Sequence, residues 1–230
     1  LFLKHSAVKF ILDPDDGRIL DANEAAEAFY GWSRDRLRSM RISQINTLSQ
    51  EEVKAEMEKA RRGQRGYFEF QHRRADGSVR DVAVYSSRID AQGKTLLHSI
   101  IHDITDRRQA QSRNEMLFTA IEHSSESVVI TDVAGTIQYV NPVFCQVTGY
   151  TREEAIGQNP RILKSGQHDE AFYQELWSTL LAGRTWRGRF VNRRKDGSFY
   201  TEDAAISPVR DEDGRVVGYV AVKRDVTQLL

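Results

Sequence analysis

The chain has 230 residues, enough for one or two domains, and its thirty-three basic and thirty-three acidic side chains give a formal net charge of zero. A zero balance argues against the broad positive field of a nucleic-acid binder, so we expect no direct contact with nucleic acid. The single cysteine, Cys145, excludes an intramolecular disulfide and a thiol-rich metal site.

The ends of the chain suggest a piece of a longer protein. No apolar run approaches the roughly 20 residues needed to cross a bilayer, and no signal peptide is visible. The sequence begins at "LFLKHSAV" without an initiator Met and ends at "DVTQLL". We therefore expect an excised cytoplasmic segment, or the cytoplasmic part of a membrane-anchored sensor, with further domains outside it.

One module occurs twice along the chain. Three segments recur in the same order: 16–37 with 134–155, 72–81 with 192–201, and 102–105 with 224–227. Within the first pair Asn23 matches Asn141, and within the second pair "RRADGS" matches "RRKDGS". Such a repeat predicts two domains of one fold.

Each copy predicts the same elements in the same order. Two short strands come first, followed by short helices and then a longer amphipathic helix. One face of that helix carries Val53, Met57 and Ala60 in the first copy and Tyr173, Trp177 and Leu180 in the second, spaced i, i+4, i+7.

Three further strands complete each copy. In the second copy they are predicted at 186–194, 199–209 and 216–225. Asp196-Gly197 predicts a two-residue hairpin turn between the first two. The result is an α+β unit, an antiparallel five-stranded sheet with helices on one face.

The segment between the copies, 106–124, contains no Gly or Pro and is rich in helix formers. We therefore expect a first domain at 1–108, a connecting helix at 109–123 and a second domain at 124–230.

This order of elements resembles the PAS domain, as do "YVNPVFCQVTGYTREEAIGQNPRILKSG" and the closing "RDVT" in the second copy and "DANEAAEAFYGWS" and "HDITDRR" in the first. The resemblance covers nearly the whole chain. It implies two sensory modules, each with a C-terminal PAC part, that detect a small-molecule ligand or a redox state in a pocket. It also implies a homodimer and an output domain in the same polypeptide, such as a histidine kinase, a diguanylate cyclase or a regulator of a bacterial two-component system.

By the same resemblance, the closing motif of each copy ties the core to the outgoing helix. The residues concerned are Asp103 and Thr105 in the first copy and Asp225 and Thr227 in the second. Asp and Thr oxygens can cap a helix N-terminus, which gives this signal-coupling role a physical basis. A plain capping role is the alternative.

The second copy also resembles the FAD-binding, redox-sensing PAS domains of bacterial regulators. That resemblance implies a flavin lying at Trp177 and Asn192, and Asn159 supplies a further polar group for its ring edge. Pro160 departs from the pattern, because some of those sensors carry a polar or acidic residue there. The alternatives are a core role for Trp177, a structural role for Asn192, and a cofactor-free interaction and dimerisation module.

Other chemistries are less well supported by the residues. Pro160 occupies the reactive position of photoreceptor PAS domains that form a cysteinyl–flavin adduct, so we expect Cys145 to be a buried structural thiol. His168 lies at the polar start of the long helix, where a solvated or capping role is expected in place of haem ligation.

In the first copy, Met57 and His72 replace the Trp and the Asn, so we do not extend flavin binding to it, and its ligand is unknown. No nucleophile–base pair, metal-ligand set or nucleotide loop is visible in either copy, and we expect no enzyme within these residues.

Overall fold

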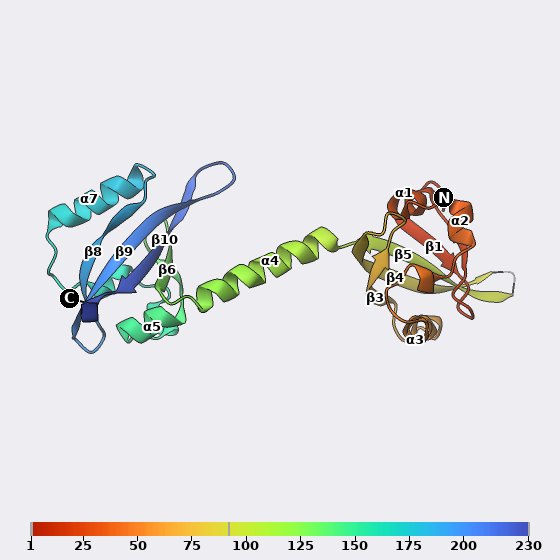
Figure 1. The fold of residues 1–230 in the computed structure, drawn as a ribbon, viewed down its shortest axis with the longest axis horizontal. Coiled ribbons are helices and arrows are strands. Elements are labelled where there is room, and N and C mark those ends of the chain that lie inside the picture. The colour runs from red at the N-terminus through yellow and green to blue at the C-terminus, as the bar shows by residue number, and fades with distance from the viewer. Residues whose placement is uncertain (1, 92, 230) are drawn as a thin grey trace. The chain divides into compact units, whose positions relative to one another are not determined.

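The computed structural model describes residues 2–91 and 93–229, so the expected domain limits at 1 and 230 lie outside the described residues. The chain forms two compact units whose boundary lies between Arg113 and Asn114 (Figure 1). Within the described ranges, each unit contains one five-stranded antiparallel sheet with helices, which confirms the predicted α+β fold.

The first unit has the strand order β2-β1-β5-β4-β3. Its elements are β1 (Val8–Leu12), β2 (Ile19–Ala22), α1 (Glu24–Tyr30), α2 (Arg34–Arg38), η1 (Ile42–Gln44), α3 (Gln50–Arg61), β3 (Tyr67–Arg73), β4 (Val79–Ala91) and β5 (Lys94–Asp103). The connecting segment forms α4 (Thr105–Glu122). In the part of the chain that the structure describes, no helix has both the length and the apolarity needed to span a membrane.

The second unit repeats this order as β7-β6-β10-β9-β8. Its elements are β6 (Ser127–Asp132), β7 (Ile137–Val140), α5 (Pro142–Thr148), α6 (Arg152–Ala155), η2 (Pro160–Leu163), α7 (Glu170–Leu181), β8 (Trp186–Arg193), β9 (Phe199–Arg210), β10 (Val216–Asp225) and η3 (Thr227–Leu229). The long helix α7 runs alongside β8 and β9 (Figure 1).

The matching asparagines Asn23 and Asn141 explain why the first helix begins at the same place in both units. The Asn141 side chain accepts from the backbone N–H groups of Phe144 and Val128, so it caps α5 and holds β6 beside it. Asn23 caps α1 by the same bond to Ala26. Each helix then ends at a glycine with positive φ, Gly31 or Gly149, a conformation that side chains with a Cβ rarely adopt.

The hairpin between β8 and β9 is longer than the predicted two-residue turn. Arg194 N–H donates to Ser198 O, and Gly197 N–H donates to Arg194 O, so residues 195–197 form the tip. The Asp196 carboxylate accepts from the Ser198 N–H and hydroxyl, which stabilises the wider loop. The Asp-Gly signal was correct for a hairpin but wrong for its length.

The two units differ in how their cores are connected. In the first unit the buried apolar residues form one continuous cluster that includes Val53 and Ala60 of α3. In the second unit they form two separate clusters. One contains Phe144 and Leu163, and the other contains Leu176 and Leu180 of α7. The space between these two clusters is the candidate site.

Candidate ligand cavity of the second unit

The second unit contains a cavity of about 200 Å³, whereas the corresponding cavity of the first unit is about 40 Å³. The larger cavity lies between α7, the inner face of the sheet and the segment around η2. Its walls include Tyr173, Leu176, Trp177 and Leu180 of α7, Phe190, Asn192, Ile206, Tyr219, Ala221 and Lys223 of the sheet, and Asn159, Pro160, Arg161, Leu163 and Lys164 around η2. The three predicted site residues therefore line one cavity.

Trp177 lies at the rim of this cavity and is 41% exposed. Its ring meets that of Tyr219 edge to face, with centroids 5.8 Å apart. The predicted core face of α7 is therefore shifted, because Leu176 and Leu180 are its buried residues. Trp177 is free to cover a ligand because it is not packed inside the core.

Asn192 lies on the cavity wall and is buried. Its Nδ2 donates to Glu202 Oε1 at 2.8 Å, and Lys223 Nζ donates to the same oxygen at 2.6 Å. Glu202 and Lys223 are also buried, at 1% and 6% exposure. Sequence reasoning missed both of these charged residues. Glu202 lies two residues from Tyr200 and Ala204, and Lys223 lies two residues from Ala221, a spacing that could have placed both on the inner face of the sheet.

Asn159 also lines the cavity, but its polar atoms already have partners. Its Oδ1 caps η2 by accepting from Arg161 N–H, and its Nδ2 donates to Gly135 O at 3.0 Å. A Cβ at Gly135 would lie only 2.8 Å from that Nδ2, so glycine is required for this contact. Because both of its polar groups are bonded to the backbone, the Asn159 side chain stabilises the wall of the cavity.

The mouth of the cavity carries exposed cations. Arg161 and Lys164 follow Pro160, which occupies the first position of η2, where a missing N–H costs nothing. Lys164 Nζ lies 3.8 Å from the centre of the Tyr173 ring. Two exposed cations beside the cavity favour a ligand with a negatively charged exposed part.

In the first unit, the counterpart of Asn192 is His72, which lines the smaller cavity. Equivalent backbone bridges join Asn46 to His72 and Lys164 to Asn192, which establishes the correspondence. The His72 ring is buried, with its Nδ1 at 2.7 Å from the Tyr30 hydroxyl. Burial lowers the pKa of His72 to about 3, so the ring is neutral. Burial also raises the pKa of Tyr30.

His168, the residue considered for haem ligation, accepts a hydrogen bond at Nε2 from the Val191 N–H at 2.8 Å. Its ring stacks on Phe172 at 4.0 Å, and burial lowers its pKa. This nitrogen is therefore occupied by a backbone donor. Cys145 is half-buried, and burial raises the pKa of its thiol, which keeps it protonated.

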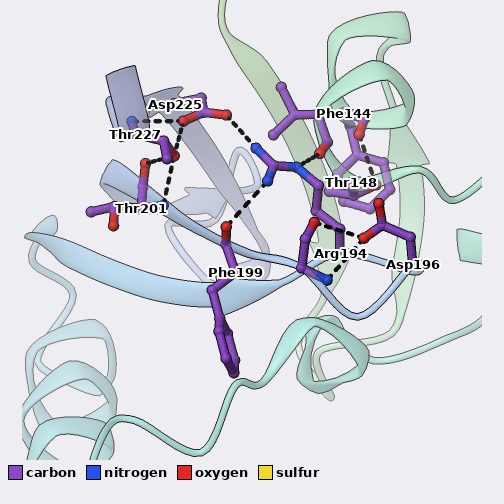
Figure 2. A network of polar contacts seen from close by, with 10 residues as sticks. Phe144, Thr148, Arg194, Asp196, Phe199, Thr201, Asp225 and Thr227 are labelled. Carbon is purple, nitrogen blue, oxygen red and sulfur yellow. Dashed lines mark hydrogen bonds and ion pairs between the residues drawn. The ribbon is translucent and has the colours of Figure 1, made fainter. Parts of the chain in front are cut away.

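The closing motifs are tied to the sheet of their own unit. Asp225 accepts from the N–H and the hydroxyl of Thr227, while the Thr227 hydroxyl oxygen accepts from Thr201 N–H of β9 at 2.9 Å (Figure 2). In the first unit Asp103 accepts from Thr105 N–H, and Thr105 Oγ1 accepts from Asp81 N–H of β4. The expected helix cap is thus only partly correct, because the Thr side chain bonds to a strand.

Arg194, from the basic run of the hairpin, connects this motif to the helical layer. Its Nη2 donates to Asp225 Oδ2 at 2.9 Å and its Nε donates to Val147 O of α5 at 2.7 Å (Figure 2). It is the main ion-pair partner of Asp225 and only about a quarter exposed. In the first unit Arg74 makes the matching bond to Phe29 O. The basic run therefore has a structural role at this residue.

A flavin fits the residues around the cavity. Aromatic and aliphatic side chains from α7 and the sheet face each other, as the ring system requires, and Asn192 and Lys223 place polar groups on the wall. The exposed cations at the mouth suit the phosphates of a dinucleotide tail. The smaller cavity of the first unit has no room for such a ring system.

Comparison with known proteins identifies the same family in both units. The family model described as PAS domain matches residues 7–106, and the one described as PAS fold matches residues 115–226. Solved structures include a PAS domain from Colwellia psychrerythraea, with 26% identity, TM-score 0.48, and coverage of 50% of this chain and 98% of that one. A light-oxygen-voltage domain studied with a flavin analogue has 29% identity, TM-score 0.45, and coverage of 49% and 86%.

Three curated relatives are regulatory or sensory proteins. The nitrogen fixation regulatory protein of Klebsiella oxytoca is 40% identical over 117 residues, covering 51% of this chain and 24% of that protein. Hybrid signal transduction histidine kinase L of Dictyostelium discoideum is 31% identical over 137 residues, covering 58% and 8%. The aerotaxis receptor of Escherichia coli (strain K12) is 34% identical over 97 residues, covering 42% and 19%. The chain thus spans a quarter or less of these relatives. It belongs to the PAS family and carries two PAS domains in tandem, sensory modules homologous to parts of signal-transduction regulators.

Proposed function

We propose that this chain is the sensory region of a bacterial signal-transduction protein whose second PAS domain binds FAD and reports its redox state. The observation that carries the proposal is the cavity of about 200 Å³ in the second domain, lined by Trp177 and Asn192, against about 40 Å³ in the first. The output domain, a histidine kinase, a diguanylate cyclase or a regulator, lies in the same polypeptide outside this segment.

The residues of the cavity have separate tasks in this proposal. Bound there, the flavin would supply electron transfer. Trp177 covers one side of the ring system from the rim, while Leu176 and Leu180 exclude water from the interior. Asn192 presents its amide to the polar ring edge and keeps its orientation through Glu202. Arg161 and Lys164 hold the charged tail at the mouth.

The route from the cavity to the end of the domain is short. Lys223 lines the cavity and lies two residues before Asp225 on β10, and Glu202 pairs with Asp225 across β9 and β10. Val226 N–H donates to Thr201 O next to Glu202. A change in the bonds of Glu202 and Lys223 would thus act directly on the strand ends that hold Asp225 and Thr227, the residues to which we assign signal coupling.

The first domain suits the cofactor-free interaction function. Its core is one continuous cluster, with His72 buried at the position of Asn192. We also propose that the chain acts in the cytoplasm as a homodimer. Met116 and Leu117 of α4 are 66% and 55% exposed, and such an apolar surface is suited to a helix from a second copy.

The absorption spectrum of the purified full chain, with extraction of any released cofactor, tests this function. We expect the visible bands of a flavin and FAD in the extract. Trp177→Ala and Asn192→Ala should each lower the affinity for FAD about 5- to 30-fold, since each removes a contact worth about 1–2 kcal/mol, and the flavin content after dilution should fall accordingly. The matched control is Met57→Ala at the position of Trp177 in the first domain, which should leave occupancy unchanged. A colourless protein made with ample flavin would refute the proposal.

A further inference from the structure

The second domain contains an ion pair that is almost fully removed from water. Lys223 Nζ lies 2.6 Å from Glu202 Oε1, and the two side chains are 7% and 2% exposed. Among the ion pairs of residues 2–91 and 93–229, no other is as deeply buried. Burying two charges carries a desolvation cost that their attraction often fails to offset. We therefore expect a buried ion pair of this kind to have a role other than stabilising the fold.

The first domain shows that the fold does not require this pair. Strand pairing places Ala204 opposite Lys223 and Glu202 opposite Asp225. The same positions in the first domain pair Val84 with Ile101 and Val82 with Asp103. Val82 and Ile101 therefore stand where Glu202 and Lys223 stand, and both are buried in the continuous core. An apolar pair builds the same sheet.

The pair is also oriented with respect to the cavity. Lys223 lines it, together with Asn192, whereas Glu202 is not among the described residues that do so. Glu202 Oε1 instead receives both the Lys223 ammonium and the Asn192 amide from behind the wall. A ligand in the cavity therefore meets the positive end of the pair. In a buried site such a field is weakly screened.

We infer that Lys223 selects the ligand of the second domain by its charge, contacting an anionic or strongly electron-rich acceptor on an aromatic ring system, with Glu202 as its positioning residue. This deepens the proposed function, because it concerns the same cavity and rests on that site being a ligand site. For a flavin, the consequence is that the reduced and more electron-rich form binds more tightly than the oxidised form.

The first test needs no bound cofactor. Anilinonaphthalene sulfonate is an anion, and phenylnaphthylamine has the same ring system without the charge. Binding of each to the cofactor-free full chain is measured by fluorescence titration for the wild type, for Lys223→Gln, which retains a donor for Glu202, and for Glu202→Val/Lys223→Ile, which installs the first domain's own residues. The preference for the anion is the ratio of the two affinities, and we expect both variants to lower this ratio at least tenfold. The control Arg224→Met removes an exposed cation that follows Lys223 on β10 but lies on the opposite face of the strand, outside the cavity lining, and it should change the preference less than threefold.

The second test measures the midpoint potential of the flavin in the same proteins during reduction by dithionite. A tenfold loss of preference for the reduced form corresponds to a fall of about 30 mV for a two-electron couple. A wild type without flavin would refute the proposed function, while the probe pair still decides the role of Lys223. Folded variants whose anion preference equals that of Arg224→Met would overturn this inference, even if flavin is bound. If the double variant does not fold, Lys223→Gln decides by the same threshold.

Discussion

The two PAS domains of this chain share one strand order but differ in the residues and in the cavity volume of their interiors. In the first, His72, Val82 and Ile101 help to close the core into one cluster around a cavity of about 40 Å³. In the second, Asn192 and the Glu202–Lys223 pair take these positions beside a cavity of about 200 Å³. Few side chains therefore distinguish the PAS domain with the small cavity from the one with the large cavity, and none of them changes the strand order.

Among substitutions that separate the two domains, the largest effect on stability is expected at the buried ion pair of the second domain. Lys223→Ile leaves the Glu202 carboxylate buried without its cation, so we expect a loss of about 3–5 kcal/mol in the unfolding free energy of the second domain. Glu202→Val/Lys223→Ile removes both charges and should recover most of that loss. Pulse proteolysis in urea, with fragments assigned to each domain by mass, measures both. Equal losses for the single and the double variant would contradict this account of the pair.

The pH dependence of the first domain gives the next largest effect. Burial lowers the pKa of His72 to about 3, below its ordinary value of about 6.5. The unfolded chain then binds the extra proton, so the first domain should lose up to about 1.4 kcal/mol per pH unit as the pH falls from 6.5 towards 3. His72→Asn, the residue of the second domain, should remove this contribution. The same urea assay between pH 7 and pH 4 checks it, and an unaltered slope in the variant would show that another group is responsible.

The fold could be predicted from the sequence almost entirely, because the repeat, the capping asparagines and the alternating strands are local signals. The lining of the cavity could be predicted only in part. Asn192 and Trp177 were found by resemblance, whereas Glu202 and Lys223 were not predicted as site residues. Lys223 and Glu202 come together only through the pairing of β9 with β10, which no short segment reveals.

Helix faces and turn lengths were less predictable for a similar reason. Tyr173, Trp177 and Leu180 have helical spacing, but the space beside α7 moves the buried face to Leu176 and Leu180. Periodicity assumes that a helix packs on a filled core, and this one borders a cavity. The Asp196-Gly197 turn is widened by side-chain bonds to Ser198 that the dipeptide alone does not specify.

The smallest effects are expected at the closing motifs. Thr227→Val removes the hydroxyl that accepts from Thr201 N–H, and Thr105→Val removes the one that accepts from Asp81 N–H. Each should cost about 1 kcal/mol. If the motifs couple signals, faster hydrogen exchange at the end of β10 in Thr227→Val should depend on whether the flavin is oxidised or reduced. If hydrogen exchange at the end of β10 increases equally in both states, the role of Thr227 is structural and not signal coupling.

The central claim, one ligand site in two similar domains, is tested most directly by the flavin content of the full chain. The account predicts one FAD per chain in the wild type and in His72→Ala. It predicts FAD-free protein when Asn192→His, Glu202→Val and Lys223→Ile together give the second domain the interior of the first. Two flavins per chain, or full occupancy in that triple variant, would contradict it.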